Sequence, residues 1–263
     1  MPIEYIDSSS AKLIYAGQHV YNVPTLIKEL VENSIDASSK NVWVSIEEKN
    51  ELEYIEVADD GDGIKLEDML LIARKNYTSK NNDGTKYGYK GEALNCILQC
   101  SNRIEIHSRN TSDVYGRVLK LNDQGELELN PKAREKGTSI KIERPFAKFP
   151  VRLTEWKRNR SSHMKTLVKI LKNIALLAPL RIVLSIKGRE ESIIFSSNGY
   201  QSMRERAKEL FGFQIEMEKR MEIGDTNVHI YLGLSERKQT LTYWNNRPIN
   251  NQVKNDTLTS LGC

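Results

Sequence analysis

The sequence has few of the residues that build disulfide frameworks, metal clusters or membrane spans. Its three cysteines, Cys96, Cys100 and Cys263, include no CxxC pair, and its four histidines are scattered. Cys96 and Cys100 lie four residues apart in a predicted helix, where we expect core thiols in a reducing compartment. No run approaches 18 apolar residues, so no transmembrane helix and no membrane association are expected.

The N-terminal residues MPIEYIDSSS are acidic and lack an apolar h-region, so no secretory signal is expected. Neither an internal repeat nor a low-complexity tract occurs. The 263 residues are 39% hydrophobic and 28% charged, which is typical of a soluble globular protein with one large domain or two ordinary ones. The net charge of +4 is too small to indicate a nucleic-acid binder by itself.

Alternation and helical periodicity predict an α+β fold. NVWVSIEE and LEYIEVA alternate apolar and polar residues on either side of a turn at 49–50, so they predict a hairpin. Further strands are predicted at 103–108, 115–121, 126–129, 138–143, 181–186 and 192–196, with two or three more up to 243. Helices are predicted at 8–16, 26–37, 66–75, from 92, at 164–178 and at 202–211, with a weak one at the end. Segregated helices and an antiparallel-looking sheet argue against a doubly wound fold.

The helix predicted over 26–37, LIKELVENSIDA, has an unusual polar side. Glu29, Asn33 and Asp36 fall within about 60° of one another at roughly 100° per residue. The opposite side is apolar and comprises Ile27, Leu30, Val31 and Ile35. Asn and Asp are poor helix-interior residues because they compete for backbone hydrogen bonds. Taken alone, such a helix is explained by an ordinary solvent-exposed face. Other segments of the sequence must decide between that explanation and a functional site.

Two glycine motifs follow. DDGDGI, residues 59–64, comes at a strand end, where Gly61 and Gly63 permit positive φ and close approach of the backbone to a ligand. GYKG opens a helix, whose free N–H groups and dipole favour phosphate. Each alone is equally typical of an ordinary turn. The spacing of a Walker A loop and the βαβ context of a dinucleotide-binding turn are both missing.

Taken in order, these segments resemble those of the GHKL ATPases. The matching pieces are E-x-x-x-N-S-x-D-A, D-x-G-D-G-I, T-S-K, G-Y-K-G-E-A-L and K-G-T-S. Within that superfamily, KELVENSIDA, TSK and GEAL look like the MutL mismatch-repair family, and F-x-x-x-P-V-R and N-x-R-P-I fit it as well. The N-R-P-I wording looks closer to the eukaryotic MLH/PMS branch. The resemblance implies a GHKL (Bergerat) sandwich of a mixed sheet and helices at 1–198, followed by an incomplete second α/β domain at 199–263.

The resemblance also implies roles for individual residues. Glu29 would be the general base that orients and activates water against the γ-phosphate of ATP. Asn33 would bind Mg²⁺ through its amide oxygen, and Asp36 would hydrogen bond near the adenine side. Asp59 would accept a hydrogen bond from the adenine N6 amine, and Thr138 would assist it through its hydroxyl. The remaining expected nucleotide contacts are Gly61 and Gly63 beside the base and a lid over the phosphates made of Thr78, Ser79, Lys80, Gly88, Tyr89, Lys90 and Gly91.

The chain departs from the family pattern at several points. Asp60 stands where Asn is usual, and its charge is expected to weaken a water-mediated contact to the nucleotide. Lys90 stands where Arg is usual, which keeps the charge but loses a bidentate fork. The lid between Lys80 and Gly88 holds seven residues, fewer than is typical. The family's D-V-N-V-x-P-x-K segment, whose lysine reaches the γ-phosphate, does not occur before Cys263. We therefore expect a fragment or a reduced family member.

The expected function is a slow, Mg²⁺-dependent ATPase module that pairs with a second MutL-family subunit and acts with a mismatch-recognition protein of the MutS family. A candidate DNA-backbone surface consists of Lys157, Arg158, Arg160, Lys165, Lys169 and Lys172, although a solvated helix face explains it equally well. Two alternatives stay open: another GHKL ATPase, and an assembly subunit that binds ATP without hydrolysing it. Localisation is expected to be nuclear for a eukaryotic protein and cytoplasmic otherwise.

Overall fold

The computed structural model describes residues 15–18, 20–71, 93–121, 127–188, 190–199, 202–223, 226–234, 243–244 and 247–248. Its centre is an eight-stranded sheet in the order β5-β4-β3-β6-β2-β1-β7-β8. The strands are β1 (Asn41–Glu48), β2 (Leu52–Asp59), β3 (Arg103–Arg109), β4 (Arg117–Leu121), β5 (Leu127–Pro131), β6 (Gly137–Glu143), β7 (Arg181–Lys187) and β8 (Glu191–Ser196). All neighbouring strands are antiparallel except β1 and β7, so the sheet is mixed.

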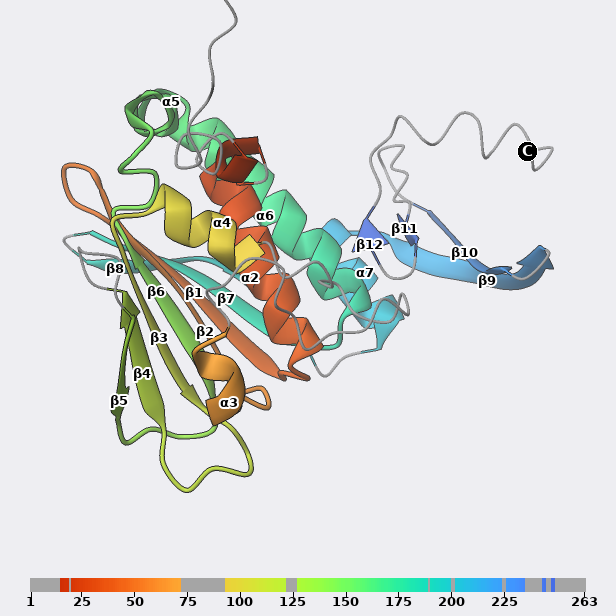
Figure 1. The fold of residues 1–263 in the computed structure, drawn as a ribbon. Coiled ribbons are helices and arrows are strands. Elements are labelled where there is room, and N and C mark those ends of the chain that lie inside the picture. The colour runs from red at the N-terminus through yellow and green to blue at the C-terminus, as the bar shows by residue number, and fades with distance from the viewer. Residues whose placement is uncertain are drawn as a thin grey trace, which may run out of the picture.

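Helices cover one face of this sheet. Figure 1 shows α2 (Val23–Asp36), α4 (Ala93–Cys100) and α6 (Arg160–Leu177) lying side by side above the strands. Strand alternation explains the layering, since Val42, Val44 and Ile46 point to the helices and are at most 1% exposed. The other face is exposed and mixed in character: Glu105 there pairs with Lys120 at 3.2 Å, while Trp43 and Ile193 are 40% and 69% exposed. Helices are therefore needed on one side only.

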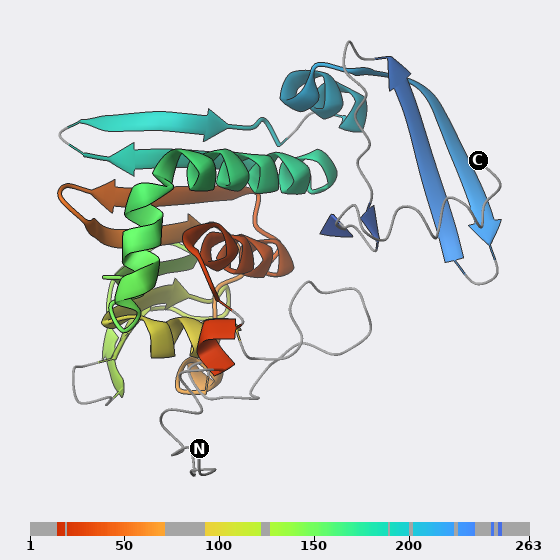
Figure 2. The ribbon, with the colours of Figure 1, turned by 90° about the horizontal axis from the view of Figure 1, so that it is seen from above.

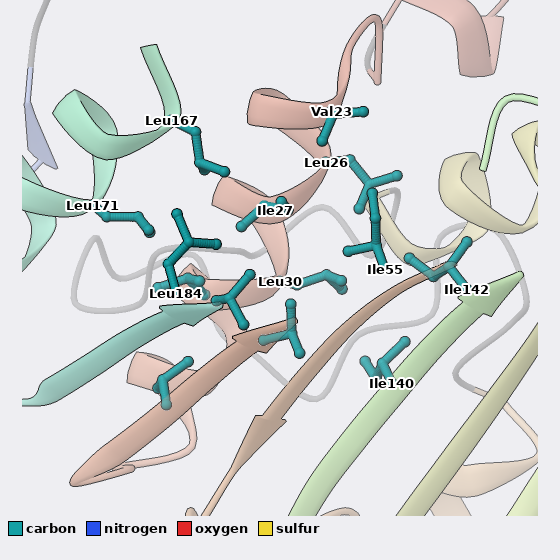
Figure 3. Packing of buried hydrophobic residues seen from close by; sticks show 14 of the residues in the cluster. Val23, Leu26, Ile27, Leu30, Ile55, Ile140, Ile142, Leu167, Leu171 and Leu184 are labelled. Atoms are coloured by element: carbon teal, nitrogen blue, oxygen red, sulfur yellow. The ribbon is translucent and has the colours of Figure 1, made fainter. Parts of the chain in front are cut away.

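Helix α2 lies in the middle of the core. It begins three residues before the predicted start, because the Asn22 side chain caps it by accepting from Thr25 N at 2.9 Å. In Figure 3, Ile27 of α2 points toward Leu167 of α6, and Leu26 lies on the other side of the helix, over Ile55 of β2. These four side chains are fully buried, and each contributes roughly 1.5–3 kcal/mol to folding. The apolar side of the predicted amphipathic helix is thus confirmed.

Helix α5 (Pro150–Arg158) was not predicted from the sequence. Its residues are mostly polar and exposed, so no apolar stripe indicates it; only Trp156 is buried. Glu48 fixes this helix to the sheet, because its Oε1 accepts from Trp156 Nε1 at 2.7 Å. Its Oε2 accepts from Arg160 Nε of α6 at 2.6 Å. Tertiary contacts rather than local periodicity therefore define α5.

Most other elements lie close to their predicted positions. The helix expected at 66–75 is described only as α3 (Leu66–Met69), and the one expected at 8–16 lies almost wholly outside the described residues. Cys96 and Cys100 of α4 are buried free thiols, as predicted. Burial raises the pKa of Cys100 to about 11, which makes this thiol unreactive. Within the described ranges, no helix combines the length and apolarity needed to cross a bilayer.

The chain after β8 adds a helix that packs on α6 and two short antiparallel sheets. Helix α7 (Met203–Phe211) starts with a capping box between Ser202 and Glu205 and ends at Gly212, whose φ is 72°. Strands β9 (Gln214–Ile223) and β10 (Thr226–Leu234) pair with each other and not with the large sheet, and Figure 2 shows them beyond α7. A short pair, β11 (Tyr243–Trp244) and β12 (Arg247–Pro248), follows.

Candidate functional site

The carboxylate of Asp59 is the best-defined feature of the predicted site. It lies at the end of β2 and is only 8% exposed. Its Oδ1 accepts from the backbone N–H groups of Gly61 at 2.9 Å and Thr138 at 3.2 Å, and its Oδ2 accepts from Ser34 Oγ at 2.9 Å. Burial raises the pKa of Asp59, although these hydrogen bonds oppose the shift. The Asp59 carboxylate is therefore held in one orientation by Ser34 of α2, Gly61 of the turn after β2 and Thr138 of β6.

The hydroxyl groups of Ser34 and Ser108 also support this arrangement. Neither residue was singled out from the sequence. Ser34 Oγ lies 3.2 Å from the carbonyl of Leu30 as well as 2.9 Å from Asp59, so its single proton has two acceptors. Ser108 Oγ lies 3.0 Å from Thr138 Oγ1 and accepts from Ile64 N at 2.8 Å. Only the position of Ser34 beside Asn33 in the motif could have indicated its role.

The contact of Thr138 differs from the prediction. We expected its hydroxyl to assist Asp59, but its backbone N–H makes that contact and its hydroxyl bonds Ser108 instead. The reason is the register of the sheet, which pairs Asp59 with Thr138 directly across β2 and β6. The same register pairs Thr138 with Ser108 of β3 on its other side, and the Thr138 hydroxyl bonds that side chain.

The glycines of DDGDGI let the turn pack closely against its neighbours. Gly63 has a φ of 72°, and a Cβ there would lie 2.1 Å from the carbonyl oxygen of Arg109. A Cβ on Gly61 would lie 2.6 Å from the carbonyl oxygen of Ala37, next to the end of α2. That same carbonyl accepts from Asp62 N at 2.8 Å. The turn is thus bound to the end of α2, which brings the two sequence motifs together.

The polar column of α2 lies at the edge of the core. Glu29, Asn33 and Asp36 are half-buried, as expected for a polar face that is not simply solvated. Lys28 Nζ lies 3.5 Å from Glu29 Oε1 and 2.9 Å from Oε1 of the buried Glu32. Burial opposes the charge of Lys28, but attraction to Glu32 and Glu29 outweighs it and raises the pKa of this lysine. Glu29 precedes Ser34, which contacts Asp59, by five residues, so the two lie about 7.5 Å apart along the helix axis.

The predicted lid falls outside the described residues. This applies to Thr78, Ser79, Lys80, Gly88, Tyr89, Lys90 and Gly91, and also to Asn246 and Ile249 of the N-x-R-P-I motif. The structure therefore brings together the α2, DDGDGI and K-G-T-S parts of the site.

Asp60 is engaged with the start of β1. Its Oδ1 accepts from the N–H groups of Lys40 at 2.8 Å and Asn41 at 2.9 Å, and its Oδ2 accepts from Asn41 Nδ2 at 2.7 Å. Partial burial works in the other direction, but these hydrogen bonds lower the pKa of Asp60. The carboxylate that departs from the family pattern thus has a structural role at this strand.

We expect Asp60→Asn to lower the free energy of unfolding by about 1–2 kcal/mol at neutral pH, because an amide group would face the donors of Asn41. A carboxylate whose pKa is lower in the folded protein stabilises the folded state at pH values above its ordinary pKa. This contribution is lost as the pH falls through the folded-state pKa. The difference between wild type and variant should therefore vanish in acid.

Urea unfolding of both proteins at neutral and acidic pH measures this effect. Asp62→Asn is the matched control, since Asp62 is exposed and its pair with Lys136 at 3.1 Å is worth at most about 1 kcal/mol. Equal stability of wild type and Asp60→Asn at both pH values would contradict the structural role.

The six basic residues predicted to contact DNA divide into two groups. Arg160 is paired with Glu48, and Lys172 Nζ donates to the carbonyl of Leu210 at 2.8 Å, at the end of α7. These two side chains hold elements of the fold together. The other four are exposed at the end of α5 and along α6: Lys157, Arg158, Lys165 and Lys169.

Comparison with known proteins supports the resemblance seen in the motifs. Residues 21–142 match the family described as histidine kinase-, DNA gyrase B-, and HSP90-like ATPase. The mismatch repair endonuclease pms1 of Dictyostelium discoideum is 34% identical over 183 residues, which cover 67% of this chain and 18% of that protein. The DNA mismatch repair protein MutL of Caldanaerobacter subterraneus subsp. tengcongensis is 30% identical over 272 residues, 98% of this chain and 45% of that protein. The chain belongs to the MutL family.

Solved structures of MutL proteins share the fold. The ATPase domain of Aquifex aeolicus MutL in complex with ADP superposes with a TM-score of 0.68 at 24% identity, covering 91% of this chain and 88% of that one. The GHKL architecture of a mixed sheet covered by helices is therefore confirmed. This chain spans less than half the length of the curated MutL-family relatives it matches.

Proposed function

We propose that this MutL-family chain binds ATP at Asp59 and hydrolyses it slowly, as the ATPase module of a mismatch repair protein. The observation that carries the proposal is the buried, three-donor carboxylate of Asp59 beside the polar column of α2. A fixed, buried acceptor is suited to recognising an exocyclic amine, since a base without that donor would leave it unpaired. The Aquifex aeolicus relative, which was solved with ADP, supports a nucleotide as the ligand.

Each residue of the site has a role in this proposal. Asp59 accepts from the adenine N6 amine, while Ser34 and the N–H of Thr138 keep its carboxylate oriented. Glu29 orients a water molecule and takes its proton as the water attacks the γ-phosphate. Asp36 hydrogen bonds on the adenine side. Gly61 and Gly63 were expected to give the base room, but the space beside them is filled by Ala37 and Arg109, so they shape the turn that carries Asp59. The predicted lid residues clasp the phosphates.

The oxygen donors of α2 also fit a magnesium ion. Mg²⁺ prefers oxygen ligands, and Asn33 presents an amide oxygen on a half-buried column that has carboxylates on either side, at Glu29 and Asp36. Asn33 would hold the ion, which when bound neutralises phosphate charge. Asn33 lies in the described part of the chain, and the apolar residues of the same helix, among them Leu30 and Val31, are buried.

A second candidate function is nucleotide binding without hydrolysis. The observation that favours it is the 3.5 Å approach of Lys28 Nζ to Glu29 Oε1, because this contact competes with a water molecule for one of the carboxylate oxygens. Turnover measurements on a Glu29 variant, described in the Discussion, distinguish the two.

Nucleotide titration tests the proposal as a whole. With Mg²⁺ present, we expect saturable binding of ATP and at least tenfold weaker binding of GTP, whose base carries an oxygen where adenine carries the N6 amine. Isothermal titration calorimetry measures both affinities. Absence of ATP binding would overturn the nucleotide assignment, and equal affinity for GTP would overturn the role of Asp59.

The larger assembly is also part of the proposal. ATP would promote pairing with a second MutL-family subunit, and the pair would act on DNA with a mismatch-recognition protein of the MutS family. The Dictyostelium discoideum relative is a mismatch repair endonuclease by name, and in line with that name we propose that the assembly works in the nucleus if the protein is eukaryotic and in the cytoplasm otherwise. We propose residues 1–198 as the ATP-binding domain and 199–263 as part of a second domain.

We expect the exposed lysines of α6 to contact DNA through its backbone. If Lys165 and Lys169 each neutralise one phosphate, replacing both by alanine should reduce the slope of log affinity against log salt by roughly 2, at about 0.9 per contact. Filter binding across about 50 to 200 mM salt measures the slope.

The matched control replaces two exposed lysines elsewhere, Lys132 and Lys148, by alanine and should leave the slope unchanged. A wild-type affinity that does not respond to salt would remove the DNA proposal. An unchanged slope in the α6 variant would move the contact to other residues.

A further inference from the structure

Arg152 of the F-x-x-x-P-V-R motif binds the segment that leads into α2. Its Nη1 donates to the carbonyl of Val20 at 2.9 Å and its Nη2 to the carbonyl of Gly17 at 2.7 Å. Gly17 lies in the short helical stretch at 15–18, and Val20 comes two residues before the N-cap of α2. Carbonyl groups at the end of a helix lack partners within it. The planar guanidinium fork of Arg152 satisfies the carbonyl of Gly17 together with that of Val20, which lies beyond the helical stretch.

The rest of the motif fixes this guanidinium. It lies over the Phe149 ring at 4.3 Å and the Phe146 ring at 5.7 Å. Phe146 is 1% exposed and has a φ of 65°, a conformation that bulky residues adopt only where surrounding packing holds them. Pro150 occupies the first turn of α5, where its fixed φ favours the helix.

Gly17 completes the contact from the other side. A Cβ at this position would lie 2.9 Å from Arg152 Nη2 and 3.4 Å from the Phe149 ring. A side chain at position 17 would displace the guanidinium from this contact. Phe146, Pro150 and Arg152 of the motif thus all serve the contact between α5 and the entry of α2. We call Arg152, Phe146, Phe149 and Gly17 the entry clasp.

We propose that Arg152 is a positioning residue for Glu29. The inference rests on the proposed function, in which Glu29 acts on the attacking water. Glu29 lies in the second turn of α2, five residues nearer the start of the helix than Ser34, which contacts Asp59 near the far end of the helix. Movement of the helix start therefore displaces Glu29 more than it displaces the carboxylate that recognises adenine.

The consequence is a separation of turnover from affinity. Asp59 is also held by Gly61 and Thr138, which do not depend on the entry of α2, so ATP affinity should survive loss of the clasp. Catalysis is more sensitive to placement, because a displacement of about 1 Å can cost roughly 100-fold in rate.

The test replaces Arg152 by lysine, which keeps the charge but cannot bond both carbonyls while stacking on the rings. We expect kcat for ATP to fall by about tenfold or more, with an ATP dissociation constant within about threefold of wild type. Amide hydrogen exchange should accelerate over residues 20–30. Gly17→Ala, which pushes the guanidinium away, should have the same signature if Arg152→Lys fails to fold.

Arg181→Lys is the control, since Arg181 is exposed at the start of β7. Unchanged kcat and unchanged exchange in Arg152→Lys and Gly17→Ala would overturn the positioning role. Equal losses in kcat and affinity would also overturn it, because they indicate general loosening of the site. If the wild type does not bind ATP, the proposed function fails by itself, and the exchange measurement still decides whether the clasp holds the entry of α2.

Discussion

Asp59→Asn should abolish ATP binding while leaving the fold at least as stable as the wild type. Asparagine can keep both bonds to Oδ1, from Gly61 and Thr138, through its own oxygen. Its amide group can donate to Ser34 Oγ, whose proton then turns to the Leu30 carbonyl at 3.2 Å. The packing therefore survives, but the adenine amine would meet a donor instead of an acceptor.

The expected loss of affinity is at least about 100-fold, or roughly 3 kcal/mol, because a buried donor would be left facing another donor. Calorimetric titration of ATP measures it, and Asp68→Asn, a half-buried aspartate of α3 outside the site, is the matched control. Wild-type affinity in Asp59→Asn would refute the adenine contact.

Stability provides an independent check with a defined sign. Burial raises the pKa of Asp59, so the folded protein holds this proton more tightly than the unfolded chain does. The cost of burying the carboxylate is therefore absent in acid and develops as the pH rises from the unfolded pKa, near 3.9, through the raised folded-state value. Urea unfolding should show Asp59→Asn to be as stable as wild type or more so at neutral pH, with the difference lost in acid. A less stable variant at neutral pH would indicate a structural role instead.

Replacement of Glu29 by alanine should nearly abolish ATP turnover while ATP still binds. Positioned general bases contribute about 10²- to 10⁴-fold in rate, and that is the expected loss in kcat. The fold should tolerate the change, because the Glu29 side chain is 32% exposed and Lys28 keeps its closer partner Glu32 at 2.9 Å. Steady-state phosphate release and nucleotide titration on the same samples measure the two quantities.

Glu67→Ala, an exposed carboxylate at the start of α3, controls for the loss of one negative charge. Unchanged turnover in Glu29→Ala with intact binding would show that Glu29 is not the base. If wild type and variant both bind ATP and neither releases phosphate, the chain is the non-hydrolysing alternative.

Local patterns in the sequence were sufficient for much of the fold. The alternation in NVWVSIEE predicted β1 with its observed bounds, and the period of 26–37 predicted the central helix. The reason is that both patterns arise from one element packing on one core. Ordered motifs then indicated the MutL family, because several short segments resembled it in the same order along the chain.

Contacts between distant residues could not be predicted from the sequence. Asp59 meets Ser34 across 25 residues and Thr138 across 79, and only sheet register decides which atom of Thr138 reaches it. Asp60 looked like a weakened nucleotide contact, but its carboxylate binds the start of β1. These contacts do not depend on the local periodicity or composition of the sequence. They therefore could not be predicted from a sequence pattern.

The sequence by itself determined which residues could form a nucleotide site: an acidic and amide column on one helix, and an aspartate followed by glycines at a strand end. Only the tertiary structure decided that Arg160 and Lys172 hold the fold together, that a polar segment forms α5, and that Arg152 binds the entry of α2. The physical reason is that a side chain's chemistry is set by its type, whereas its partner is set by how the whole chain packs.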